Sequence, residues 1–167
     1  MAVQRRRGFL RRSLQAGGAT LSALALLGRR RAEGQAGMVS GFDHVAAPMR
    51  STEAMLRFYR DLGFQVIEGE RICSVHFGDH KINFHRPALW QDEQFTLRAP
   101  AAEPPCGDFC FVWDGTESAL AETLARAGAE VVTGPVPRTG GRSGGTAQGT
   151  SRYTRDPDGN LLEFIVY

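Results

Sequence analysis

The chain has 167 residues, 42% of them hydrophobic and 23% charged, which is typical of a soluble globular protein with one domain and a tail. The formal net charge is +2, but arginines are concentrated near the N-terminus and the remainder is mildly acidic, which argues against a nucleic-acid partner. No apolar run is long enough to span a bilayer, so no membrane partner is expected. The three cysteines form no even disulfide set and are expected to be free thiols.

Residues 1–40 are predicted to be a basic arm that is disordered or serves targeting, ahead of a domain at residues 41–167. Arginine clusters lie on both sides of an apolar stretch, and the first acidic residue is Glu33. This pattern is similar to a mitochondrial presequence. Arg6 and Arg7 ahead of the apolar stretch also fit a twin-arginine export signal. A basic tail without a targeting role, on a cytoplasmic protein, is the third interpretation, and all three stay open.

The first half of the domain predicts one helix among several strands. A strand is expected at residues 42–49, where Pro48 favours a sheet edge or a strand end. A helix follows, with Ser51 or Thr52 as its cap and Gly63 as its stop. Three more strands are expected at residues 64–67, 72–77 and 81–85. A connecting loop is expected at residues 87–105.

The same order of elements then begins again. A strand at 108–113 precedes a helix capped by Thr116 or Ser118 and stopped by Gly128. A short strand is expected at 130–132, a break at 134–137 and a glycine-rich flap at 139–149, before a final hairpin whose turn is Asp156-Pro157-Asp158-Gly159. The order βαβββ therefore occurs twice, which predicts an α+β fold with an internal repeat.

Two βαβββ modules, with Phe58-Tyr59-Arg60-Asp61-Leu62-Gly63-Phe64 in the first and Asp156-Pro157-Asp158-Gly159-Asn160-Leu161-Leu162-Glu163 in the second, resemble the vicinal oxygen chelate superfamily. Residues 77–85 and 134–140 are similar to the glyoxalase domain-containing protein 5 group within it. The resemblance covers residues 42–167 and implies the glyoxalase/bleomycin resistance/dioxygenase fold, in which the modules form a curved sheet around a central cup that holds a divalent metal.

The resemblance also implies which residues hold the metal, because the ligands of glyoxalase-like members come from the first and last strand of each module. His44 and Glu163 match this pattern, and Glu163 would also act as the catalytic base. Asp108 stands where a histidine or glutamate is commoner. Asn83 replaces the carboxylate of the first module, and this departure leaves Asn83 and the nearby His85 as substrate-binding candidates.

Strand periodicity tests the same set, because side chains two residues apart share one face of a sheet. It places Asn83 and His85 on one face of their strand, with the apolar residues Ile82 and Phe84 on the other face. On the last strand, Glu163 lies on the face opposite to Leu162 and Phe164. If these faces line one cup, the site has mixed nitrogen and oxygen donors, which suit Zn, Ni, Mn or Fe. The alternative for Glu163 is an ion pair with an arginine such as Arg152. His76, His80 and Cys110 are expected to have ordinary structural roles.

Two functions follow from these expectations. The first is a metal-dependent small-molecule enzyme of lyase, isomerase or dioxygenase type, in which the metal acts as a Lewis acid. The second is a metal-free protein that binds and sequesters a small molecule, as bleomycin-resistance members do, and Asn83 in place of a carboxylate favours it. A homodimer is expected for both, because an open curved sheet leaves edge strands exposed.

Overall fold

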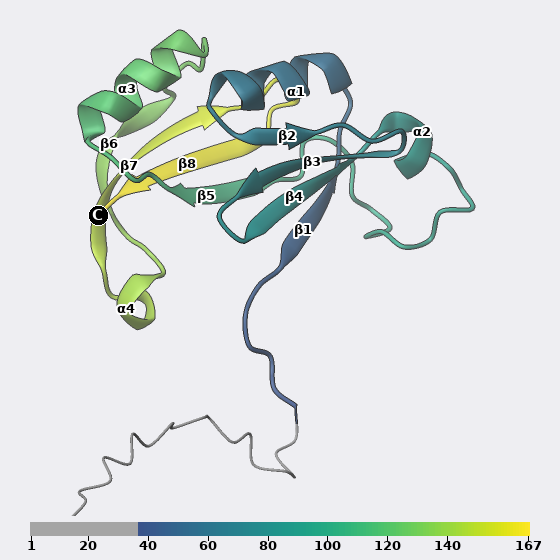
Figure 1. Cartoon of the computed structure of the whole chain (residues 1–167), viewed down its shortest axis with the longest axis horizontal. Helices are drawn as coiled ribbons and strands as arrows, with labels where there is room; N and C mark the ends of the chain where they lie inside the picture. The colour runs from purple at the N-terminus through teal and green to yellow at the C-terminus, as the bar shows by residue number, and fades with distance from the viewer. Residues whose placement is uncertain (1–36) are drawn as a thin grey trace, which may run out of the picture. The chain divides into compact units, whose positions relative to one another are not determined.

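The computed structural model describes residues 37–167, and the fold below is that of Ser40–Tyr167 (Figure 1). The arm predicted at residues 1–40, with its three possible roles, lies almost wholly outside the described residues. Among the residues that are described, no helix has the length and hydropathy needed to cross a membrane.

The first module has the predicted order βαβββ. Its sheet has the strand order β1-β4-β3-β2, in which β1 runs parallel to β4 and the other pairs are antiparallel. A short helix, α2, lies in the loop that follows the module. The elements are β1 (His44–Pro48), α1 (Thr52–Asp61), β2 (Gln65–Ile67), β3 (Ile72–Phe77), β4 (His80–His85) and α2 (Pro87–Trp90).

The second module repeats this order, and its sheet has the equivalent strand order β5-β8-β7-β6. Again the first and last strands are parallel neighbours, and the other pairs are antiparallel. The elements are β5 (Asp108–Val112), α3 (Glu117–Arg126), β6 (Thr133–Thr139), α4 (Arg142–Gly145), β7 (Gln148–Arg155) and β8 (Leu161–Val166). The predicted fold class and internal repeat are therefore confirmed.

One predicted strand is wrong. Residues 130–132 form no strand, and β6 instead runs through the Gly134–Pro137 segment that was expected to break the chain. The physical reason is that β6 is an edge strand with β7 as its sole neighbour, so Pro135 and Pro137 need not donate to a second ladder. The pairing shifts register between Thr133 and Val136, which accommodates this segment.

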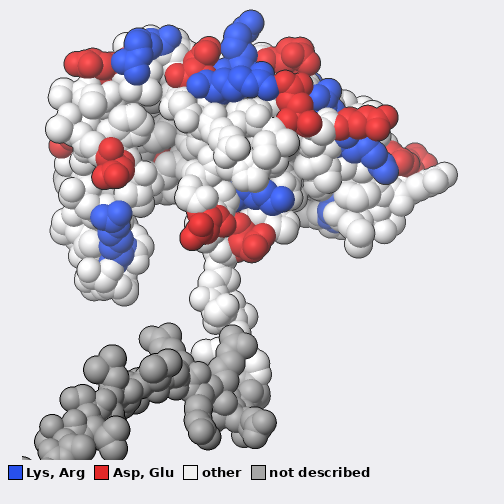
Figure 2. Space-filling model, viewed as in Figure 1, with Lys and Arg blue, Asp and Glu red and all other residues white. Residues whose placement is uncertain are grey.

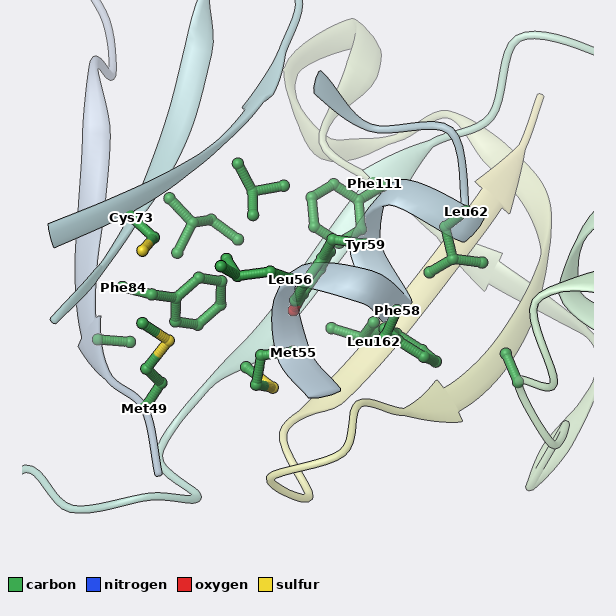
Figure 3. Close-up of a cluster of buried hydrophobic side chains, with 14 of the residues drawn as sticks. Met49, Met55, Leu56, Phe58, Tyr59, Leu62, Cys73, Phe84, Phe111 and Leu162 are labelled. Carbon is green, nitrogen blue, oxygen red and sulfur yellow. The ribbon is translucent and has the colours of Figure 1, made fainter. Parts of the chain in front are cut away.

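One hydrophobic core serves both modules, and Figure 3 shows α1 within it. Met55, Leu56 and Tyr59 of α1 are completely buried. The ring of Phe64, after α1, lies 5.0 Å from the ring of Phe111 on β5, so aromatic packing crosses from one module to the other. Each fully buried large apolar side chain contributes about 1.5–3 kcal/mol to folding.

The second module also caps the helix of the first. Ser51 is the N-cap of α1, but its side chain makes no capping hydrogen bond. Instead, the backbone amides of Arg50 and Ser51 donate to the carboxylate of Asp158 at 2.6 and 2.9 Å. A carboxylate at a helix N-terminus satisfies free amides and interacts favourably with the helix dipole. The Asp156–Gly159 turn thus fixes one module against the other.

Candidate functional site

Glu163 lies on the face of the second sheet that is opposite the core. In the strand pairing it stands directly across from Cys110 on β5 and Tyr153 on β7. The adjacent residues Leu162 and Phe164 are buried in the core, as the period of two predicts. Glu163 is half-buried, so its carboxylate needs hydrogen-bond partners.

Neutral side chains provide these partners. The Oγ of Ser151, which is completely buried, donates to Oε1 of Glu163 at 2.5 Å. Burial raises the pKa of the Cys110 thiol to about 12, and the neighbouring Glu163 carboxylate adds to the shift. The thiol is therefore protonated at neutral pH, and it faces Glu163 as a neutral group. The Tyr153 hydroxyl also has its pKa raised, by burial and by the Glu163 carboxylate that stands across from it.

Arg152 does not pair with Glu163. It lies opposite Phe164 in the β7–β8 ladder, which places it on the core side of the sheet, whereas Glu163 lies on the other side. None of the ion pairs formed by residues 37–167 includes Glu163. Within residues 37–167, the predicted ion pair between Glu163 and an arginine such as Arg152 is therefore wrong.

His44 begins β1, on the face of the first sheet that is opposite the core. Its Nδ1 lies 2.6 Å from Oδ1 of Asp43, and this contact lowers the pKa of the Asp43 carboxyl. A histidine held by a carboxylate through one ring nitrogen has its orientation fixed and presents the other nitrogen, which is the usual arrangement of a metal-binding histidine. His44 is exposed, so its Nε2 is accessible.

Asn83 and His85 share this face, as predicted. In the β1–β4 ladder they stand opposite Ala46 and Pro48. His85 is 6% exposed because the loop after β4 covers it, with the Phe95 ring 5.3 Å away. This burial lowers the pKa of His85 and so favours the neutral imidazole.

Within the described chain the two faces do not form one metal site. His44 and Asn83 belong to the first sheet and Asp108 and Glu163 to the second, and no ladder joins the sheets. No group of three or more His, Cys, Asp or Glu side chains suited to a metal occurs in residues 37–167. The candidate residues therefore lie in two separate groups, here called half-sites, one that includes edge strand β1 and one that includes edge strand β5.

A groove of about 680 Å³ between the modules is a feature that the sequence did not predict. The residues that line it come from the end of α1, the start of β2, the β3–β4 turn, β5 and the residue after it, and β8. His76 and His80, which were expected to be ordinary strand and turn residues, line this groove. No sequence signal marks it, because its walls come from separate modules and form when the modules pack together.

Comparison with known proteins adds three relatives. The virulence protein STM3117 of Salmonella typhimurium is 32% identical over 132 residues, which cover 78% of this chain and 86% of that protein. The glyoxalase domain-containing protein RDO1 of Mycosarcoma maydis is 32% identical over 130 residues, which cover 77% of this chain and 69% of that protein. A structure from the mobile metagenome of V. pseudocholerae matches with a TM-score of 0.68 and 30% identity, over 80% of this chain and 98% of that one.

A family model matches residues 41–164, nearly the whole of the predicted domain. Its boundaries enclose both modules, both half-sites and the groove between the modules. The predicted superfamily is therefore confirmed, while the narrower similarity to the glyoxalase domain-containing protein 5 group stays a prediction. The chain belongs to the Glyoxalase/Bleomycin resistance protein/Dioxygenase superfamily.

Proposed function

We propose that this protein is a metal-dependent enzyme of lyase, isomerase or dioxygenase type that acts on a small molecule. The observation that carries the proposal is the state of the two main ligand candidates. His44 has one ring nitrogen held by Asp43, and Glu163 has one oxygen held by Ser151. Among the described residues, Glu163 forms no ion pair with a lysine or arginine, and His44 pairs with Asp43 alone.

The donor set fits a divalent ion such as Zn, Ni, Mn or Fe, since it offers an imidazole nitrogen and two carboxylates. His44 would come from one chain, and Asp108 and Glu163 from a second chain. The free edges of β1 and β5 support such a homodimer, because unpaired edge strands are ready to pair with another chain. Each dimer would then contain two shared sites.

When bound, the ion supplies Lewis-acid polarisation of substrate oxygens. The protein's own groups would do the rest. Glu163, oriented by Ser151, would serve as the base as well as a ligand. Asn83 and neutral His85 lie further along the same face than His44, across from Ala46 and Pro48, and would hydrogen-bond a substrate that extends along it. The loop that covers His85 would limit the entry of water at that end of the face.

Metal analysis of the purified protein, before and after chelation and reconstitution, tests the proposal. We expect close to one equivalent per chain, and a large loss of metal in both His44→Ala and Glu163→Gln. Glu130→Gln is the matched control, because Glu130 is exposed and lies outside both half-sites. Less than about a tenth of an equivalent, after reconstitution with each candidate metal, would refute the proposal.

Mixing the two variants tests the sharing of sites between chains. A heterodimer of His44→Ala and Glu163→Gln chains has one site with both ligands lost and one site with both intact. We therefore expect mixing to restore about half of the wild-type metal per heterodimer. If every site used ligands of one chain, each would lack one ligand and mixing would restore nothing.

A metal-free binding protein is the second candidate, and one observation favours it. Asn83 occupies the place on β4 where the second module has Glu163 on β8, and an amide is a weaker ligand than a carboxylate. In this case small-molecule affinity would be the same before and after chelation, and His44→Ala would leave it unchanged. Affinity that disappears on chelation would exclude this candidate.

A further inference from the structure

The groove between the modules is an aromatic cavity that lies outside the two half-sites. Its volume of about 680 Å³ is within the range of small-molecule pockets. The rings of Phe64 and Phe77 lie 5.0 and 5.1 Å from that of Phe111, and these three residues come from three different strands or strand ends. Phe164 and Trp113 extend the aromatic wall.

Three polar side chains are among the residues that line this cavity. His76 and Gln65 stand opposite each other in the β2–β3 ladder, and both line the groove together with His80. One nitrogen of His76, Nε2, contacts Oγ of Ser74 at 2.9 Å, which leaves Nδ1 available. An apolar pocket with a few convergent polar groups is the usual form of a small-molecule site.

The groove is separate from the proposed metal site. Of the residues assigned to the half-sites, namely His44, Asn83, His85, Asp108 and Glu163, none lines it. Cys110 is the one boundary residue, because it lines the groove and also stands across from Glu163. A ligand in the groove would therefore contact Cys110 but none of the proposed metal ligands.

We propose that this groove binds an aromatic small molecule that carries an anionic group. The rings of Phe64, Phe77 and Phe111 provide edges and faces for aromatic packing. The imidazoles of His76 and His80, with the amide of Gln65, provide the donors for the anionic group. No side chain of Asp or Glu lines the groove, so an anion makes no direct contact with a carboxylate there.

The chain contains its own reporter, because one of its two tryptophans, Trp113, lines the groove. In the variant Trp90→Phe, Trp113 is the sole tryptophan. Titration of the full chain with 1-anilinonaphthalene-8-sulfonate, an aromatic sulfonate, is expected to quench Trp113 fluorescence with saturable one-to-one binding. Absence of saturable quenching in the folded protein would overturn the proposal, and would be the result if a second copy of the chain fills the groove.

A pair of matched variants locates the binding. Gln65 and Ile67 are exposed residues on the same face of β2, but Gln65 lines the groove and Ile67 does not. In the Trp90→Phe background, Gln65→Phe is expected to weaken binding of the sulfonate about tenfold or more by narrowing the groove, whereas Ile67→Phe leaves it unchanged. Equal affinity in the two folded variants would overturn the proposal.

Two further variants test the chemistry. His76→Ala and His80→Ala are expected to lower affinity for the sulfonate by about tenfold, and to change affinity for neutral N-phenyl-1-naphthylamine much less. Equal losses for both probes would overturn the anionic assignment. Glu163→Gln, which disables the proposed metal site, is expected to leave sulfonate binding intact, so that failure of the metal proposal and failure of this one are distinguishable.

Discussion

The phenol of Tyr59 donates a hydrogen bond of 3.0 Å to Oδ2 of Asp156 and so joins helix α1 of the first module to the final turn of the second. Both groups are buried, at 0% and 4% exposure. Asp156 is also satisfied by the backbone amides of Asp158 and Asn160 and by the Asn160 side chain. Because buried polar groups are costly when left unpaired, this hydrogen bond fixes how the two modules pack.

Removal of the Tyr59 hydroxyl is the first test of this arrangement. Tyr59→Phe keeps the buried ring but removes one donor from a buried carboxyl, so we expect a loss of about 1.5–3 kcal/mol in the free energy of unfolding, measured by urea denaturation. Tyr153→Phe is the control, because the hydroxyl of Tyr153 accepts from exposed Arg138 at the surface. A loss below about 0.5 kcal/mol for Tyr59→Phe would contradict the structure.

Stability should also depend on pH through Asp156. Burial is the main cause that raises the pKa of this carboxyl in the folded state. The folded protein thus holds the Asp156 proton more tightly than the unfolded chain does. Protonation of Asp156 therefore contributes to the free energy of unfolding in full below the unfolded pKa of about 4, and this contribution is lost as pH rises through the folded pKa. Urea denaturation between pH 4 and 7 should show the advantage of wild type over Asp156→Asn shrinking as pH rises. An advantage that grows with pH would refute the assignment.

Much of the fold was predictable because it depends on local signals. The two glycine stops, Gly63 and Gly128, end α1 and α3 with φ of 93° and 66°. Alternation of apolar residues placed Phe84 and Phe164 on the core side of their strands. The prediction failed at β6 because the prolines were judged from the local sequence alone. A strand tolerates prolines when it is an edge strand, and the order of strands in a sheet cannot be read from the local sequence.

The site was less predictable, because it depends on contacts between distant segments. Periodicity correctly placed Glu163 on the open face, but it did not identify Ser151, which is twelve residues earlier and reaches Glu163 through the β7–β8 pairing. The side-chain cap on α1 was expected from Ser51 or Thr52, whereas Asp158 of the other module provides it. The groove lined by His76 and His80 likewise exists through packing of the two modules.

Ser151 should therefore affect metal binding without being a ligand. Side chains that hydrogen-bond a metal ligand typically contribute 10–100-fold to affinity, so Ser151→Ala is expected to weaken metal binding by about that factor in calorimetric titrations. Ser143→Ala is the matched control, because Ser143 is exposed in α4. Unchanged metal affinity in a folded Ser151→Ala protein would show that Ser151 does not position Glu163.

Cys110 reports on the charge of Glu163. Burial of the Cys110 thiol raises its pKa to about 12, and the Glu163 carboxylate is the second cause of the increase. The residue as a whole is exposed, so a labelling reagent can reach it. Because the thiolate is the reactive form, we expect iodoacetamide at pH 8 to label Cys110 roughly a hundredfold or more slower in the folded protein than in urea, measured by peptide mass spectrometry. Glu163→Gln removes the negative charge but not the burial, so labelling should become faster yet stay slower than in urea, while Glu130→Gln should change nothing. Equal rates in wild type and Glu163→Gln would mean that the carboxylate does not lie beside this thiol.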